Sequence, residues 1–97
     1  MVLIIFVIVN INVKTLASKD IDSWQDYLEL AIENLRVAEK NLKSGLKKEA
    51  CSYQKKASFY GIKAFINIRE QVEEGNLDFS QDEISNNIRI WEELANC

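Results

Sequence analysis

Apolar residues recur at helical spacing through the first half of the chain. They stand three or four positions apart, at Trp24, Leu28, Ala31, Leu35, Ala38 and Leu42. This spacing places them on one face of an α-helix and does not fit a strand, whose side chains alternate with a period of two. The charged residues of the segment mostly fall off this stripe. The pattern therefore predicts an amphipathic helix.

A second stripe follows Ser44 and Gly45. Its members are Ala50, Tyr53, Gln54, Ala57, Gly61, Ala64, Ile68 and Val72. Gly45 and Gly75 stand directly after the two stripes, where a left-handed glycine commonly ends a helix. Residues 20–74 therefore predict two long helices folded back on each other at Ser44-Gly45.

Gly61 lies inside the second predicted helix, where glycine costs about 1 kcal/mol relative to alanine. With Ala57 and Ala64 it forms a strip of small residues, which indicates the close approach of another helix rather than a ligand cleft. Larger apolar residues widen this face beyond what one partner helix can cover. They are Phe59, Ile62, Phe65 and Ile66. We expect a third helix or another subunit to pack against them.

The third helix is predicted from about Gln81 to Ala95. Ser80 and Glu83 form a capping box, as Ser23 and Asp26 do for the first helix. The fold class is therefore all-α, an antiparallel helical hairpin plus a third helix, with residues 20–97 as one domain. The residues expected to carry helix packing are Trp24, Leu28, Leu35, Ala57, Gly61, Ala64 and Trp91.

Residues 2–9 are strongly apolar and uncharged. The run is shorter than the roughly 20 residues that span a bilayer. A signal peptide is disfavoured because no basic residue precedes the run and residues 15–17 make a poor cleavage site. We expect residues 1–19 to form an apolar arm and connector, or a strand that pairs across a dimer. A wrongly assigned start codon is the remaining alternative.

The composition excludes most catalytic chemistries. The chain has no histidine, which is the commonest general base and metal ligand. Glycine-rich phosphate motifs are absent, and Glu29 with Glu33 fits a solvated helix face. We expect no catalytic, cofactor or metal site. Cys51 and Cys97 make neither a disulfide framework nor a CxxC motif, so we expect reduced thiols in the cytoplasm and leave a bridge between them open.

Charge is unevenly distributed along the chain. Residues 36–69 hold nine basic and two acidic residues, a net charge of +7. Residues 70–97 hold one basic and eight acidic residues, a net charge of −7. Cations at a helix N-terminus are unfavourable. The candidate contacts for an anion or partner are Lys43, Lys47, Lys48, Lys55 and Lys56. RNA, a nucleotide phosphate or an acidic protein face would fit them, and so would a head-to-tail contact between subunits. An ordinary solvated lysine cluster is the alternative.

Short motifs between Ser23 and Ile66 point to a family. They are Trp24, Asp26 and Tyr27, then Ala31-x-x-Asn34-Leu35-x-x-Ala38, Gly45, Glu49-Ala50-Cys51 and Ala57…Gly61-x-Lys63-Ala64. With these motifs the stretch resembles a HEPN domain, a helical domain of prokaryotes. Gly61 stands where the family commonly has alanine, and Phe59-Tyr60 replaces a usual Glu-Lys pair.

The resemblance implies an up-and-down helical bundle that dimerises, often paired with a minimal nucleotidyltransferase as toxin with antitoxin. Active members are RNases with an Arg-x(4–6)-His motif. Here Leu94 stands where the shortest spacing from Arg89 would place the histidine of this motif, and no histidine follows. The resemblance therefore implies a degenerate or truncated, non-catalytic member. We expect a cytoplasmic homodimer that acts by binding a nucleotidyltransferase-type partner, RNA or a nucleotide. The alternatives are a residual RNase that uses Arg89, and a generic helical protein-interaction module.

Overall fold

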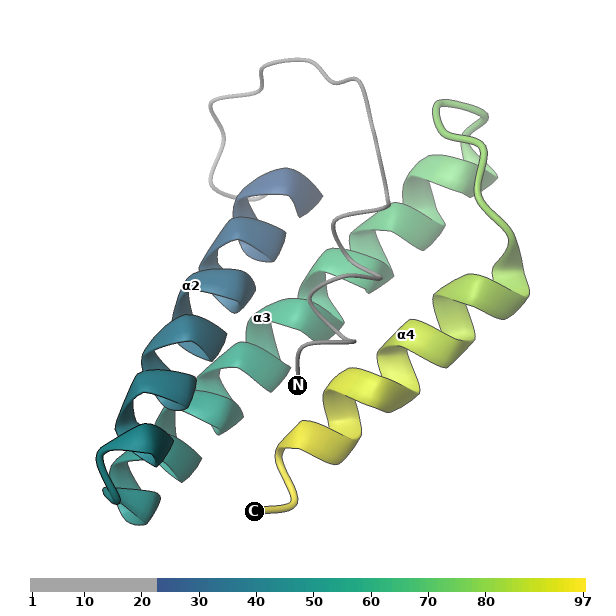
Figure 1. Ribbon diagram of the computed structural model, residues 1–97. Helices are drawn as coiled ribbons and strands as arrows, with labels where there is room; N and C mark the ends of the chain where they lie inside the picture. Colours follow the sequence, from purple (N-terminus) through teal and green to yellow (C-terminus); the bar gives the residue numbers. More distant parts are fainter. Residues whose placement is uncertain (1–22) are drawn as a thin grey trace.

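The computed structural model describes residues 23–97, which form three α-helices (Figure 1). They are α2 (Trp24–Lys43), α3 (Lys47–Glu73) and α4 (Gln81–Leu94). The predicted all-α class, with a helical hairpin and a third helix, is confirmed. The predicted arm of residues 1–19 lies outside the described residues.

The serine caps predicted for two helices are present. The Ser23 hydroxyl accepts a hydrogen bond from the Asp26 N–H at 3.3 Å and donates one to the Asp26 carboxylate at 3.0 Å. The Ser80 hydroxyl accepts from the Glu83 N–H at 3.2 Å. Each hydroxyl satisfies a backbone donor that has no partner within its helix, so α2 and α4 begin at these residues.

Glycine ends α2 and α3 in the same way. Gly45 and Gly75 have φ values of 80° and 81°, a region that L-residues with a side chain rarely adopt. The residue after each glycine donates its N–H five residues back, Leu46 to the Asn41 carbonyl and Asn76 to the Gln71 carbonyl, at 2.8 and 2.9 Å. This is the Schellman pattern, and it reverses the chain within a few residues.

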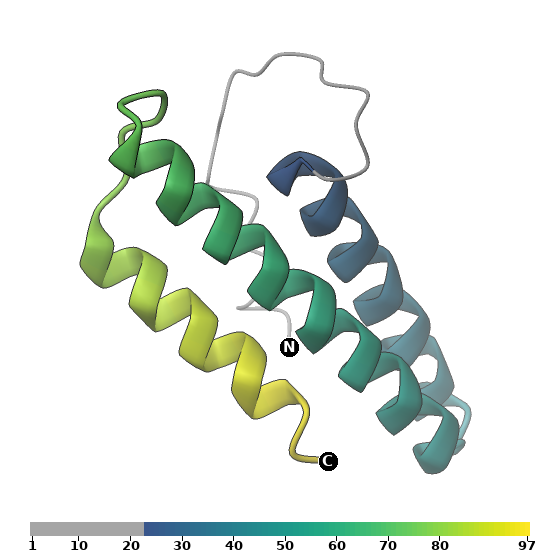
Figure 2. The ribbon, with the colours of Figure 1, turned by 180° about the vertical axis from the view of Figure 1, so that it is seen from behind.

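The helix α3 is the centre of the molecule, with α2 packed on one side and α4 on another (Figures 1 and 2). Their shared core consists of Trp24, Leu28, Ala31, Leu35, Ala57, Ala64, Phe65, Ile68, Ile84, Trp91 and Leu94. Gly61 is also buried. All of the residues expected from the sequence to carry helix packing therefore lie in this interior.

At Gly61, a side chain of α4 packs directly against the backbone of α3. A Cβ atom added there would overlap the indole ring of Trp91, which is fully buried. Glycine therefore makes room for the largest of the fully buried side chains. Among residues 23–97, the Trp91 Nε1–H has no hydrogen-bond partner.

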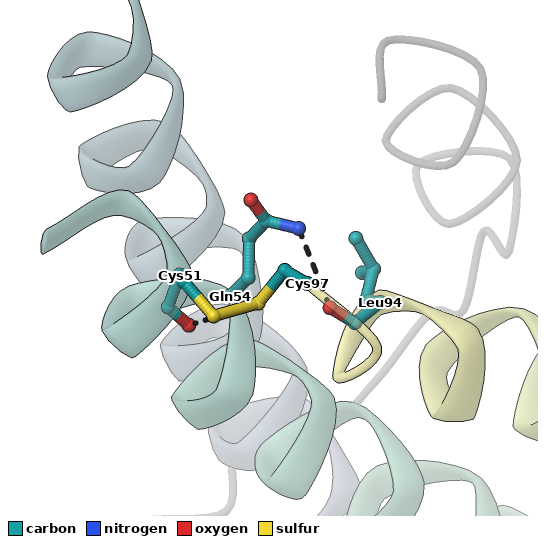
Figure 3. The surroundings of a disulfide bond; sticks show 4 residues. All are labelled: Cys51, Gln54, Leu94 and Cys97. Atoms are coloured by element: carbon teal, nitrogen blue, oxygen red, sulfur yellow. Dashed lines mark hydrogen bonds between the residues drawn. A yellow bond between two sulfur atoms is a disulfide. The ribbon is translucent and has the colours of Figure 1, made fainter. Parts of the chain in front are cut away.

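The two cysteines form a disulfide, which corrects the expectation of reduced thiols. Cys51 and Cys97 are bonded, with their Cα atoms 5.6 Å apart (Figure 3). The reason is that α4 runs back along α3 and ends beside its second turn. There the Gln54 side-chain amide donates to the Leu94 carbonyl at 3.3 Å. The bond therefore fastens the C-terminal residue to α3.

Candidate functional site

Five exposed lysines gather toward one end of the hairpin. We call them the basic end: Lys43, Lys47, Lys48, Lys55 and Lys56. The short turn of residues 44–46 places Lys43, the last residue of α2, near Lys47, the first residue of α3. Lys48 and Lys55 are seven residues apart on α3 and therefore share a face about 10 Å apart. The structure thus brings Lys43, Lys47 and Lys48 together around the turn and extends the set to Lys55, whereas Lys56, nine residues after Lys47, lies on the other side of α3.

Within the basic end, the helix dipole accounts for Lys43 in the last turn of α2 but not for Lys47 and Lys48 at the start of α3. Among residues 23–97 the only ion pair joins Arg89 and Glu93, so none of the five lysines has an acidic partner there. Leu46, at the N-cap of α3, makes no side-chain capping bond. Lys47 and Lys48 therefore sit at an uncapped, positive helix end. Each such cation is unfavourable by about 0.3–1 kcal/mol.

Two leucines lie exposed among these lysines. Leu42 and Leu46 keep 42% and 46% of their surface accessible, on either side of the turn. The basic end therefore combines lysines with two exposed apolar side chains. Sequence reasoning placed Leu42 on the buried stripe, because periodicity does not show where a partner helix ends.

Acidic residues gather at the opposite end, around the turn between α3 and α4. They are Glu70, Glu73, Glu74, Asp78, Asp82 and Glu83. The last turn of α3 contains no basic residue, although cations are favoured there by the helix dipole. The dipole of α3 therefore favours Glu49 in its first turn but does not account for Lys47 and Lys48 there, nor for the acids at its end.

A second surface feature is a groove on α3 beside α2. It has a volume of about 450 Å³ and is lined by Tyr27, Phe59, Ile62, Lys63, Ile66, Asn67 and Glu70. We call it the aromatic groove. Phe59 and Ile66 remain 54% and 44% exposed. The sequence indicated that this face needs cover, but α4 packs over another part of α3 and supplies none of the lining residues.

Charged groups in the aromatic groove are held in place. The Lys63 ammonium lies 5.2 Å from the centre of the Phe59 ring and 5.8 Å from that of Tyr27. Asn67 accepts a hydrogen bond from the Trp24 N–H at 3.1 Å and donates one to the Glu70 carboxylate at 3.4 Å. The groove therefore presents one cation and one anion, each in contact with a neighbouring side chain, with apolar side chains between them.

Arg89, the candidate for a residual RNase, lies exposed on α4. It pairs with Glu93 at 3.4 Å and donates to the Asn86 side chain at 3.5 Å. Within residues 23–97 no three His, Cys, Asp or Glu side chains are grouped so that they could hold a metal ion. In the same part of the chain, no helix has the length and apolarity required to cross a membrane.

No protein-family model, curated protein or solved structure matches this chain. The chain is a small all-α protein whose described part contains three helices, and this is the level at which it is classified. The resemblance to HEPN domains rests on the sequence motifs alone.

Proposed function

We propose that this protein acts by binding an acidic partner protein through its basic end and that it catalyses no reaction. The observation that supports this is the exposure of Leu42 and Leu46 among lysines that have no acidic partner within residues 23–97. Protein interfaces combine an apolar centre with a polar rim. Lysines at the rim would steer an acidic partner and set its orientation.

RNA is the second candidate ligand, through contacts between the lysines and phosphates. It is less well supported, because phosphate contacts are made by charged and polar groups and would leave Leu42 and Leu46 exposed to water. A residual RNase has less support still, because Arg89 pairs with Glu93 and the chain has no histidine.

A finer version of the proposal follows the HEPN resemblance of residues 23–66. In that version the protein is a non-catalytic, dimeric HEPN-like domain, and the acidic partner is a nucleotidyltransferase in a toxin–antitoxin-type pair in the cytoplasm. The disulfide argues against this location, because such bonds persist mainly in oxidising compartments. A generic helical interaction module in an oxidising compartment agrees better with Cys51 and Cys97. An export signal in residues 2–9 would also agree with an oxidising compartment, although the sequence disfavours such a signal.

The test reverses charge at two positions, Lys47→Glu and Lys48→Glu together. Binding is measured by fluorescence anisotropy with a labelled acidic peptide of alternating Glu and Leu, and with a single-stranded RNA of about 20 nucleotides. We expect the wild type to bind the peptide and the double variant to bind it at least about tenfold more weakly. The same variant should raise the free energy of unfolding by about 0.5–2 kcal/mol, because acids are favoured at the start of α3.

The matched control is Arg36→Glu with Arg69→Glu, which makes the same change in charge outside the basic end and should retain most of the binding. Equal peptide binding by the Lys47/Lys48 variant and the wild type contradicts the proposal. Tighter binding of RNA than of peptide replaces it with the second candidate.

A further inference from the structure

We propose that the aromatic groove binds the aromatic groove of a second copy of this chain, with the two α3 helices antiparallel. This inference rests on the groove alone and is independent of the basic end.

Charge within the groove selects the second copy and its direction. Lys63 and Glu70 are seven residues apart on α3, which is two helical turns, or about 10 Å, along one face. When two α3 helices lie antiparallel, Lys63 of each copy faces Glu70 of the other, and Ile66 falls close to the two-fold axis. A parallel arrangement would instead bring like charges together. The groove is therefore complementary to itself in the antiparallel arrangement, as a two-fold symmetric interface requires.

Both charged side chains already make contacts within the single chain. Lys63 lies over the rings of Phe59 and Tyr27, and Glu70 accepts a hydrogen bond from Asn67. Ordering flexible side chains is one of the costs of association. These contacts limit the conformations of the two side chains that would meet across the axis, and so lower that cost.

The apolar residues supply the attraction and the charges supply the register. Phe59 and Ile66 are 54% and 44% exposed and would be covered by the second copy. Exposed ion pairs contribute little to affinity, but like charges in apposition disfavour the wrong arrangement. The groove spans only about 17 Å of one helix, from Phe59 to Glu70. It is therefore smaller than a standard interface, so we expect a dimer that dissociates in the micromolar range.

The test is sedimentation velocity of the full chain between about 5 and 500 µM, with four variants in the groove. We expect the wild type to shift from monomer to dimer across this range. Ile66→Asp should raise the dissociation constant at least about tenfold, because it buries a carboxylate at the two-fold axis. Lys63→Glu and Glu70→Lys should each raise it about three- to tenfold, and the double variant K63E/E70K should return it to within about twofold of the wild type.

The control is the double variant R89E/E93R, which exchanges the exposed ion pair of α4 and should leave the dissociation constant unchanged. Helix content by circular dichroism verifies that each variant is folded. A wild type that stays monomeric to about 500 µM overturns the proposal, as does a dimer unaffected by Ile66→Asp or a double variant no better than the single ones. If the monomeric protein still binds the acidic peptide, the proposed function stands and only the dimer fails.

Discussion

At the scale of single residues, Gly61 shows how one position connects the sequence with the packing of two helices. Glycine in the middle of a helix lowers its stability, so its presence in α3 needs a reason. The reason is the Trp91 indole, which occupies the space where a side chain would begin. The same indole is fully buried, and its N–H has no partner within residues 23–97, which costs about 1–3 kcal/mol. Large apolar area is therefore buried at this site at the expense of one hydrogen bond.

Replacing Gly61 with alanine is expected to destabilise the protein by about 1–2 kcal/mol. The added methyl group overlaps Trp91, and overpacking of this kind outweighs the roughly 1 kcal/mol that alanine contributes to helix propensity. Urea denaturation followed by circular dichroism measures the change. Ser52→Ala, at an exposed position of α3, should leave stability unchanged or raise it slightly. A rise in stability for Gly61→Ala would show that α4 does not approach α3 this closely.

At the scale of the helices, α2 and α4 begin with a side-chain cap that α3 lacks. The first two begin with serine caps and carry acids in their first turns, Asp26 in one and Asp82 with Glu83 in the other. The helix α3 begins without a side-chain cap and has Lys47 and Lys48 beside Glu49 in its first turn. It is nevertheless the longest helix among residues 23–97, and α2 and α4 both bury parts of its surface. Tertiary packing, rather than local signals, stabilises it.

Removing the cap of α4 tests this contrast. Ser80→Ala should lower the free energy of unfolding by about 1 kcal/mol, because the Glu83 N–H loses the acceptor that it has at 3.2 Å. Chemical denaturation measures the loss. Ser85→Ala, the same change at an exposed position within α4, should have little effect. Equal effects of the two substitutions would contradict a capping role for Ser80.

At the scale of the whole molecule, the disulfide completes a small core. The bond joins positions 46 residues apart and fastens the end of α4 to α3. A chain of this size buries a limited fraction of its surface, so a covalent link contributes a large share of its stability. Much of that contribution comes from restricting the unfolded chain.

The double variant C51S/C97S should lower the free energy of unfolding by about 2–4 kcal/mol, as expected for a closed loop of this length. Denaturation of the wild type with and without a phosphine reductant provides the same comparison without mutation. The reduced wild type should match the double variant. An unfolding midpoint that reductant leaves unchanged would show that the link does not stabilise the protein.

Local signals were sufficient to predict the helices, the starts of α2 and α4, and the ends of α2 and α3. The stripe of period 3.6 in α2, the serines at positions 23 and 80, and the glycines at 45 and 75 all act through contacts within a few residues. Such contacts can be recognised without knowledge of the fold. The disulfide was missed for the opposite reason. Its two cysteines are distant in sequence, and neither lies in a spacing that indicates pairing.

The sequence by itself determined three amphipathic helices, the absence of imidazole chemistry and the separation of basic from acidic residues, because periodicity, composition and charge are properties of the chain. The tertiary structure decided which part of α3 is covered by α4 and which is left as the aromatic groove. It also brought Cys51 to Cys97 and left Leu42 and Leu46 exposed among lysines. These outcomes depend on how the helices are positioned along one another. That position is set by the packing of side chains such as Trp91 on Gly61.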